Sequence, residues 1–293
     1  MHITEWPNAG VSSVVLAGLY IMVGLGWVLL FRATQVLNFA TGQLILLGAC
    51  LYYTFTASLH LPFVVSLVLA LAVMTVVGAA VHGLLIRRVS GTEGFFAPVI
   101  LTLGISTVIA QAVNLGYGSG SLAISVPLGN HAYRTGSVAI TSIGLIMLAL
   151  GLVALFAMQL IIRRSRWGTQ MRAAAESTVL ASQSGINVDR VFLVGWAATA
   201  FILTLVGVSY GASTIVTTSL ADIGLRGLAV AIVGGFDSLT GLAPAALIVA
   251  LTENFSVVFL GESVRDAAVM VVILIVLAIR PQGLFGSRSV VRV

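Results

Sequence analysis

The chain has 293 residues, of which 59% are hydrophobic and only 8% are charged. Soluble domains carry about 25% charged residues, so this composition excludes an ordinary water-covered surface and indicates a protein dissolved in a lipid bilayer. All 14 basic residues are arginine, which excludes a P-loop ATPase lysine and a Schiff-base lysine. A lone cysteine, Cys50, excludes an internal disulfide and a cysteine metal cluster.

Apolar runs recur along the whole chain, and a membrane-spanning helix needs about 20 apolar residues. The first run follows an N-terminus without basic residues, so we expect a retained span and not a cleaved signal peptide. The runs lie at 11–31, 40–59, 61–86, 95–115, 138–162, 191–210, 225–243, 244–260 and 265–280. We therefore predict one all-α integral membrane domain, residues 1–293, with about 8–10 transmembrane helices. The short runs beside Gly241 suit half-helices.

Arginine placement predicts the orientation of these helices. Basic residues in short loops stay on the cytoplasmic side. Arginines follow the first, third, fifth and last runs: Arg32, Arg87, Arg88, Arg163, Arg164, Arg166, Arg172, Arg280, Arg288 and Arg292. We therefore expect the N-terminus outside, the C-terminus in the cytoplasm, and the loop at 116–137 outside.

The stretch 161–190 is the longest polar segment that this orientation places in the cytoplasm. Thr169 is suited to begin a helix as its N-cap, and Gly185 is suited to end it. Met171, Ala175 and Val179 recur every four residues on one face, and Asn187 or Asp189 is placed to cap the next span. Two interpretations remain open: a surface helix without a partner, and a docking helix for a soluble protein.

Polar residues interrupt the apolar runs at two places. The sequence NFATGQ occupies Asn38–Gln43, and GGFDSLTG occupies Gly234–Gly241. Irregular backbone within a membrane is tolerated only inside protein or beside water. The N-terminus of a half-helix at such a break offers free N–H groups to an anionic substrate. A plain interfacial turn is the alternative at both places.

Polar side chains on the fourth run suggest a lined pathway. Thr102, Ser106 and Gln111 are spaced so that they could share a helix face. They serve either as a substrate pathway or as partners for their own backbone.

Glu253 lies inside an apolar run, where a charge needs a partner. Arg226 and Arg265 are the candidates, and we interpret the group as a structural ion pair, with a proton-coupling carboxylate as the alternative. His82 has no second histidine at metal-binding spacing, so we expect it to pack at a helix interface. Gly207 and Gly211 fit a G-x-S-x-G pattern, but inside a helix they predict close packing.

Five motifs in order resemble those of a known family. They are LNFATGQLILLGA at 37–49, PVILTLGIS at 98–106, MRAAAESTVLASQSGINVDRV at 171–191, AIVGGFDSLTG at 231–241 and RPQGLFG at 280–286. The chain is similar over nearly its full length to the permease subunits of branched-chain amino-acid ATP-binding-cassette (ABC) importers. Thr41 and Gln43 stand where that family usually has His and Glu, which bears on the substrate.

The resemblance implies a type II ABC importer-like fold in a bacterial inner membrane. Residues 168–186 would be a cytoplasmic coupling helix on a separate ATPase, and the chain itself would hold no cofactor, metal or catalytic residue, with ATP and Mg²⁺ on the ATPase. Expected partners are two ATPase subunits, a second permease or another copy of this chain, a periplasmic or lipid-anchored solute-binding protein and membrane lipid, but no nucleic acid. Coupling is assigned to Arg172, Ala175, Glu176, Ala181, Gly185 and Ile186, and the substrate pathway to Asn38, Thr41, Gln43, Thr102, Ser106 and Gln111.

The substrate stays open between a branched-chain amino acid and another small carboxylate, amide or urea. The runner-up function is a stand-alone secondary transporter or channel, in which Glu253 and Asp222 would couple ions.

Overall fold

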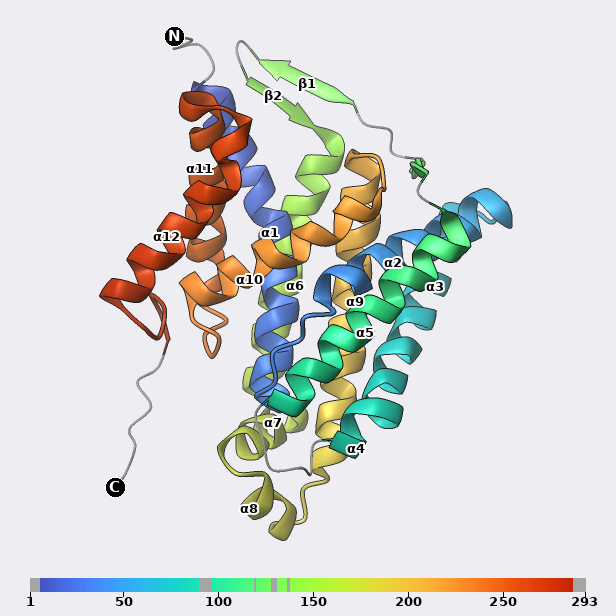
Figure 1. Ribbon diagram of the computed structural model, residues 1–293, viewed down its shortest axis with the longest axis vertical. Helices are drawn as coiled ribbons and strands as arrows, with labels where there is room; N and C mark the ends of the chain where they lie inside the picture. The colour runs from blue at the N-terminus through green and yellow to red at the C-terminus, as the bar shows by residue number, and fades with distance from the viewer. Residues whose placement is uncertain (1–5, 90–95, 119, 128–130, 136–137, 287–293) are drawn as a thin grey trace. The chain divides into compact units, whose positions relative to one another are not determined.

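The computed structural model describes residues 6–89, 96–118, 120–127, 131–135 and 138–286. Helices dominate this part of the chain (Figure 1). The α-helices are α1 (Trp6–Thr34), α2 (Thr41–Tyr53), α3 (Phe63–Ala80), α4 (Arg87–Val89), α5 (Phe96–Tyr117), α6 (Ser142–Arg164), α7 (Arg166–Glu176), α8 (Thr178–Gln183), α9 (Val188–Ser213), α10 (Ile223–Gly234), α11 (Leu242–Leu260) and α12 (Arg265–Ile279). Two π-helical turns, η2 (Thr54–Ser58) and η3 (Val81–Ile86), and two 3₁₀ turns, η4 (Thr218–Asp222) and η5 (Glu262–Val264), adjoin them.

The predicted helical membrane fold is confirmed, with fewer complete crossings than expected. Within the described residues, six helices are long and apolar enough to cross a membrane: Trp6–Thr34, Phe63–Val89, Phe96–Tyr117, Ser142–Arg164, Val188–Ser213 and Leu242–Leu260. The other three predicted runs form α2, α10 and α12, of 13, 12 and 15 residues. Such helices are too short to span the membrane alone, because polar or glycine-containing breaks cut the apolar runs.

One predicted boundary is wrong at the start of the fifth run. Residues Val138–Thr141 form strand β2, which pairs antiparallel with β1 (Ala132–Thr135), and α6 begins only at Ser142. β-Branched residues favour a strand here. The backbone N–H of Ala139 also donates to Asn8 Oδ1 at 3.0 Å, which ties the hairpin to the beginning of α1.

The described residues group into two compact units. Unit 1 contains residues from 1–28, 128–155 and 226–293, and unit 2 contains residues from 29–127 and 156–225. Helices α1 and α6 contribute residues to both units. In unit 1, α1 packs against α6 so closely that a Cβ on Gly18 or Gly151 would overlap the backbone of the other helix.

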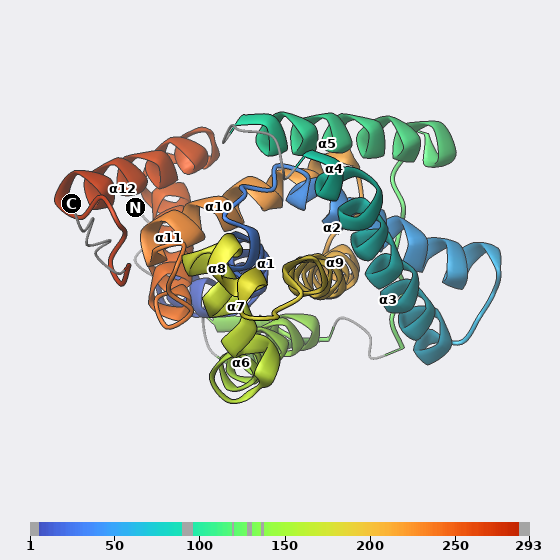
Figure 2. The same cartoon turned by 90° about the horizontal axis from the view of Figure 1, so that it is seen from below.

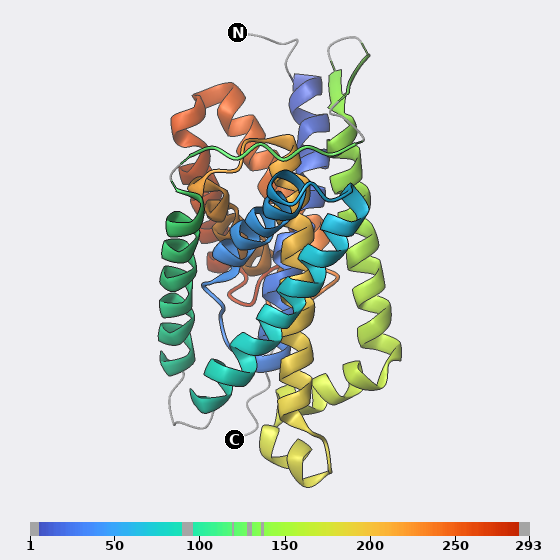
Figure 3. The ribbon, with the colours of Figure 1, turned by 90° about the vertical axis from the view of Figure 1, so that its right-hand side faces the viewer.

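Unit 2 is organised around α9, which packs against α2 and α3 (Figure 3). Glycines allow the close approach. A Cβ on Gly207 of α9 would meet the carbonyl oxygen of Ile45 on α2, and a Cβ on Gly78 of α3 would lie 2.6 Å from the carbonyl oxygen of Trp196 on α9. The prediction that Gly207 is a packing residue is therefore confirmed. The hydroxyl of Ser209, the serine of the same pattern, donates to the carbonyl oxygen of Leu205 in its own helix at 2.6 Å.

Replacing Gly207 with alanine should lower the stability of the protein. The new methyl group meets main-chain atoms that cannot rotate away, and overpacking of this kind costs about 1–3 kcal/mol. Thermal unfolding of the detergent-solubilised protein measures the effect. Gly104→Ala on α5 is the matched control, because a Cβ there meets nothing within 4 Å. An equal melting temperature for both variants would contradict the packing role.

Candidate functional site

The 168–186 segment starts at a tight corner between α6 and α7. Ser165 is the N-cap of α7, and its Oγ accepts from the N–H of Gly168 at 3.0 Å. The predicted cap, Thr169, is wrong: it lies inside the first turns of α7, four residues after the true cap. A Cβ on Gly168 would overlap the backbone of Ile162, so only glycine lets α7 turn so closely beneath the end of α6.

Arg172 reinforces this corner instead of pointing away from the protein. Its Nη1 donates to the carbonyl oxygen of Ile162 at 2.7 Å, and its Nη2 lies 3.3 Å from Thr169 Oγ1. The guanidinium therefore satisfies a free carbonyl at the C-terminus of α6, where a cation is also favoured by the helix dipole. Arg172 holds α7 against α6 through its side chain.

The segment is two helices and not the single helix predicted. Ser177 has extended backbone angles, φ −160° and ψ 114°, and its Oγ accepts from the N–H of Leu180 at 3.2 Å to cap α8. Serine competes for backbone donors in this way and favours caps over helix interiors. The four-residue repeat therefore stops: Met171 is buried, Ala175 is partly buried, and Val179 is 63% exposed.

The end of the segment follows the sequence prediction. Gly185 has φ +81°, and the N–H of Ile186 donates to the carbonyl oxygen of Ala181 at 3.0 Å, which closes the last turn of α8. Asn187, one of the two predicted caps, begins α9: its Oδ1 accepts from the N–H of Arg190 at 2.9 Å. Figure 2 shows α7 and α8 beside α9, which is seen nearly end-on.

The residues assigned to coupling are exposed to different degrees. Glu176 and Gly185 are exposed, Ala175 and Ile186 are partly buried, and Ala181 is buried. Val179 and Leu180, each 63% exposed, are not among the coupling residues predicted from the sequence. Their exposure depends on the break at Ser177, and an uninterrupted helical repeat does not predict it.

The first membrane break brings together four of the six pathway residues. The N–H of Ala40 donates to Asn38 Oδ1 at 3.0 Å, and Thr41 Oγ1 donates to the carbonyl oxygen of Asn38 at 2.7 Å. Thr102 of α5 accepts from the N–H of Phe39 at 3.3 Å. Asn38, Thr41 and Thr102 are at most 1% exposed. Side chains therefore support the irregular backbone just before α2.

Two buried polar atoms at this break have no hydrogen-bond partner among the described residues: Asn38 Nδ2 and Gln43 Oε1. Leaving such an atom unpaired costs about 1–3 kcal/mol, so each marks a place where a polar ligand would be favoured. The junction of η4 and α10, far along the chain, packs closely against the break. A Cβ on Gly42 would overlap the carbonyl oxygen of Ala221, and a Cβ on Gly224 would lie 2.6 Å from the backbone nitrogen of Gly42.

The remaining pathway residues diverge along α5. Ser106 is partly buried, one turn beyond the buried Thr102, whereas Gln111 is exposed. At 3.6 residues per turn, the nine residues from 102 to 111 amount to about two and a half turns. Gln111 therefore lies on the opposite face from Thr102, and the predicted shared face holds only for Thr102 and Ser106.

In unit 1, the second break and the RPQGLFG motif form one structure. The N–H groups of Leu284 and Phe285 donate to the carbonyl oxygens of Val233 and Gly234 at 2.8 and 3.2 Å. The C-terminal turn thus caps α10. Gly235 and Gly283 pack backbone to backbone with φ +97° and +81°, which glycine alone adopts without strain.

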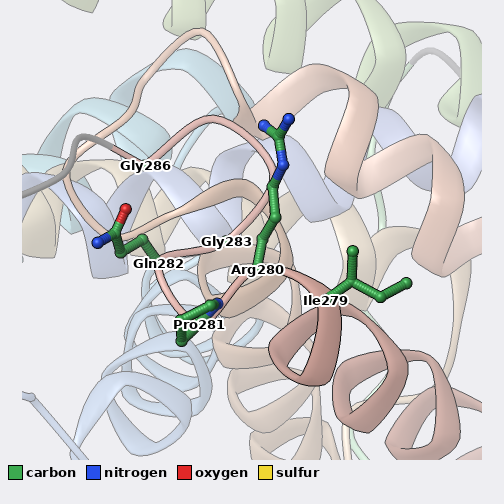
Figure 4. A pocket seen from close by; sticks show the side chains of 6 residues that line it. All are labelled: Ile279, Arg280, Pro281, Gln282, Gly283 and Gly286. Atoms are coloured by element: carbon green, nitrogen blue, oxygen red, sulfur yellow. The ribbon is translucent and has the colours of Figure 1, made fainter.

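A cavity of about 410 Å³ lies beside this C-terminal turn, lined by Ile279, Arg280, Pro281, Gln282, Gly283 and Gly286. The side chains of Ile279, Arg280 and Gln282 fan out in different directions (Figure 4). Arg280 Nη1 donates to the carbonyl oxygen of Leu284 at 3.0 Å and so closes the turn.

A buried charge network links four helices of unit 1, namely α1, α10, α11 and α12. Glu253 of α11 is 1% exposed; its Oε1 lies 2.7 Å from Arg226 Nη1 and 3.5 Å from Arg265 Nε. Tyr20 of α1 donates to Glu253 Oε2, and Arg226 also reaches Asp266 at 3.5 Å. Both arginines considered from the sequence therefore contact Glu253, as a structural ion pair requires.

Replacing Glu253 with glutamine should destabilise the protein. The change leaves Arg226 and Arg265 without their shared carboxylate, and breaking a buried pair by removing one partner costs about 3–5 kcal/mol. Glu262→Gln is the matched control, because that side chain is 68% exposed and, among the residues that the structure describes, forms an ion pair only with Arg265. Thermal unfolding in detergent measures both. A Glu253→Gln protein as stable as the control would contradict a structural role.

The chain is similar over nearly its whole length to known membrane transport proteins. Residues 11–279 match the family described as branched-chain amino acid transport system / permease component. The chain is 28% identical to the high-affinity branched-chain amino acid transport system permease protein LivH of Escherichia coli K12, covering 96% of each protein. It is 26% identical to the corresponding protein BraD of Pseudomonas aeruginosa, covering 97% of this chain and 96% of that protein.

A solved structure, PsaBC from Streptococcus pneumoniae in complex with Fab, resembles the fold. The TM-score is 0.50 at 16% identity, with 94% of this chain and 92% of that chain covered. The likeness supports a helical ABC permease fold. Permeases of this family are multi-pass membrane proteins that leave ATP binding to separate subunits. Because the family match covers most of its length, the chain belongs to the permease components of branched-chain amino acid transport systems.

Proposed function

We propose that residues 168–186 dock on an ATPase subunit and carry its movement into the membrane helices. The observation that carries this proposal is the shape of the segment. Its base is fixed by Gly168 and Arg172 against Ile162, and its far helix, α8, exposes Val179 and Leu180. A rigid base with an exposed apolar tip suits a lever that inserts into a groove of a partner.

The proposed assembly extends what the family implies. Two ATPase subunits hold ATP and Mg²⁺, a second permease or another copy of this chain completes the pore, and a periplasmic or lipid-anchored binding protein delivers the solute. Residues 1–293 act as one permease domain, because α1 and α6 each pass from one compact unit into the other without a break.

The proposed orientation has the N-terminus outside and the C-terminus in the cytoplasm. Its support within unit 2 is that the arginine-rich end of one helix contacts the beginning of another. Arg87, after α3, lies 3.2 Å from Asp189 at the beginning of α9, directly after the 168–186 segment. Short basic segments remain on the cytoplasmic side, and this end of unit 2 carries the arginines at 87, 88, 163, 164, 166 and 172.

The proposed substrate is a small solute with a carboxylate or amide, of which a branched-chain amino acid is the leading candidate. Its support is the first break, where Asn38 Nδ2 is a free donor and Gln43 Oε1 a free acceptor at the N-terminus of α2. A helix N-terminus favours an anionic group. The stretch Asn38–Gln43 has no ionisable side chain, so these contacts would be hydrogen bonds.

Replacing Leu180 with glutamate should uncouple transport from ATP hydrolysis. A charge at an apolar contact removes about 1.5–3 kcal/mol of burial energy and adds a desolvation cost, so we expect affinity for the ATPase to fall at least about tenfold. Pull-down titration with the ATPase and ATP-driven uptake into proteoliposomes measure the effect. Gly185→Arg and Glu176→Arg test the neighbouring positions.

The matched control is Leu115→Glu, which changes another exposed leucine, at the far end of α5. We expect it to retain ATPase binding. Normal affinity and normal uptake in the Leu180→Glu protein would contradict the docking role.

Replacing Gln43 with leucine should weaken uptake of the solute. The change removes Oε1, the acceptor proposed to bind an N–H group of the solute, and loss of a hydrogen bond to a charged group costs about 1.5–3 kcal/mol, which is about tenfold or more in affinity. Gln111→Leu is the matched control, since Gln111 is exposed on the opposite face of α5 from Thr102. Initial uptake rates of labelled leucine and of urea separate the two substrate classes. Equal leucine uptake by both variants would contradict substrate contact at Gln43.

A further inference from the structure

The cytoplasmic end proposed for α3 is a π-helical turn, η3, at Val81–Ile86. The N–H of Arg87 donates to the carbonyl oxygen of His82, five residues earlier, in place of the usual four. In an α-helix, residues five apart point about 140° away from each other. A π turn stacks them instead, and isolated π turns occur frequently at functional sites. Here the turn places His82 and Arg87 on one side of the helix.

Both side chains meet the same carboxylate. His82 Nε2 lies 3.0 Å from Asp189 Oδ1, and Arg87 Nε lies 3.2 Å from Asp189 Oδ2. His82 is 1% exposed and its ring packs edge-on against Phe192, with centroids 6.1 Å apart. Each oxygen of Asp189 is therefore engaged by a different residue of the same turn, which fixes the carboxylate in two directions.

Asp189 is available for this contact because Asn187 caps α9. The cap bond goes from the N–H of Arg190 to Asn187 Oδ1, so the carboxylate of Asp189 projects to α3 instead of closing its own helix. Gly185, in the last turn of the 168–186 segment, lies only four residues before Asp189. A displacement of α8 reaches Asp189 before it reaches any later residue of α9.

We propose that His82, Arg87 and Asp189 are positioning residues that transmit the movement of the 168–186 segment to α3. This inference rests on the proposed coupling function and names the joint through which it acts. α3 and α9 also pack along their lengths through Gly78 and Trp196. A clamp at one end makes the pair move together instead of sliding. Without the clamp, ATP hydrolysis continues, but less of it is converted into solute movement.

The test uses the complete complex in proteoliposomes with its ATPase subunits and binding protein. Asp189→Asn and Arg87→Gln should lower the number of solute molecules transported per ATP by about five- to tenfold, the low end of typical coupling between sites. ATP hydrolysis should stay within about twofold of wild type. Arg88→Gln is the matched control: it removes a neighbouring exposed arginine that makes no ion pair with any residue the structure describes.

A purely structural clamp would lower the melting temperature of Asp189→Asn and Arg87→Gln but leave the ratio of solute to ATP unchanged, and that result would overturn the inference. An equal fall in Arg88→Gln would also overturn it, because the effect would then follow total charge. Arg87 is 65% exposed, so Arg87→Gln should fold even if Asp189→Asn does not. Absence of ATP-driven uptake in the wild-type complex would overturn the proposed function itself.

Discussion

Every backbone N–H and C=O inside a membrane must find a partner within the protein, and the places where this chain breaks its helices depend on that constraint. Before α2, side chains provide the partners: Asn38 and Thr102 accept from the N–H groups of Ala40 and Phe39. After α10, a distant piece of backbone does so, as Leu284 and Phe285 donate to its last carbonyls. Two breaks with the same sequence character are therefore built by different means.

The two breaks also differ in how completely their polar atoms are paired. At the first break, Asn38 Nδ2 and Gln43 Oε1 find no hydrogen-bond partner in the described part of the chain. At the second, the C-terminal turn fills the gap and glycine backbones touch at Gly235 and Gly283. The two atoms at the first break are the ones that the proposed solute contact would use. The second break joins α10 to the chain that follows α12, which gives the RPQGLFG motif a structural reason.

The polar segment between α6 and α9 differs from the two breaks because many of its residues are exposed. Gly168 and Arg172 convert the end of α6 into a fixed corner, and Asp189 ties the beginning of α9 to the end of α3. Between these two attachments, α8 is free to present Val179 and Leu180. In the proposed coupling, a force applied at that tip would pass to α6 through one attachment and to α3 and α9 through the other.

The sequence predicted the apolar helices well because the bilayer imposes a minimum length and composition on them. Gly185 and Asn187 were also predictable, since a left-handed turn and an N-cap each need particular residue types. The break at Ser177 was not predictable, because a serine is compatible both with a continuous helix and with an N-cap. Its hydrogen bond from the N–H of Leu180, seen only in the structure, makes it a cap. The π turn at Val81–Ile86 was also not predictable from the sequence, because His82 and Arg87 lie on the same side of the helix only when the helix widens there. The predicted position of Gln111 was wrong because it lies nine residues, about two and a half turns, after Thr102 and therefore on the opposite face of α5.

The most direct test of the account is which side of the membrane α8 faces. Ser182 is exposed on α8, and the native Cys50 is buried, so Ser182→Cys provides a single accessible thiol. A membrane-impermeant maleimide should label this cysteine in inside-out vesicles and leave it unlabelled in intact cells. Adding the ATPase subunits to the vesicles should then slow the labelling. Labelling in intact cells would place α8 beyond the reach of any ATPase and contradict the account.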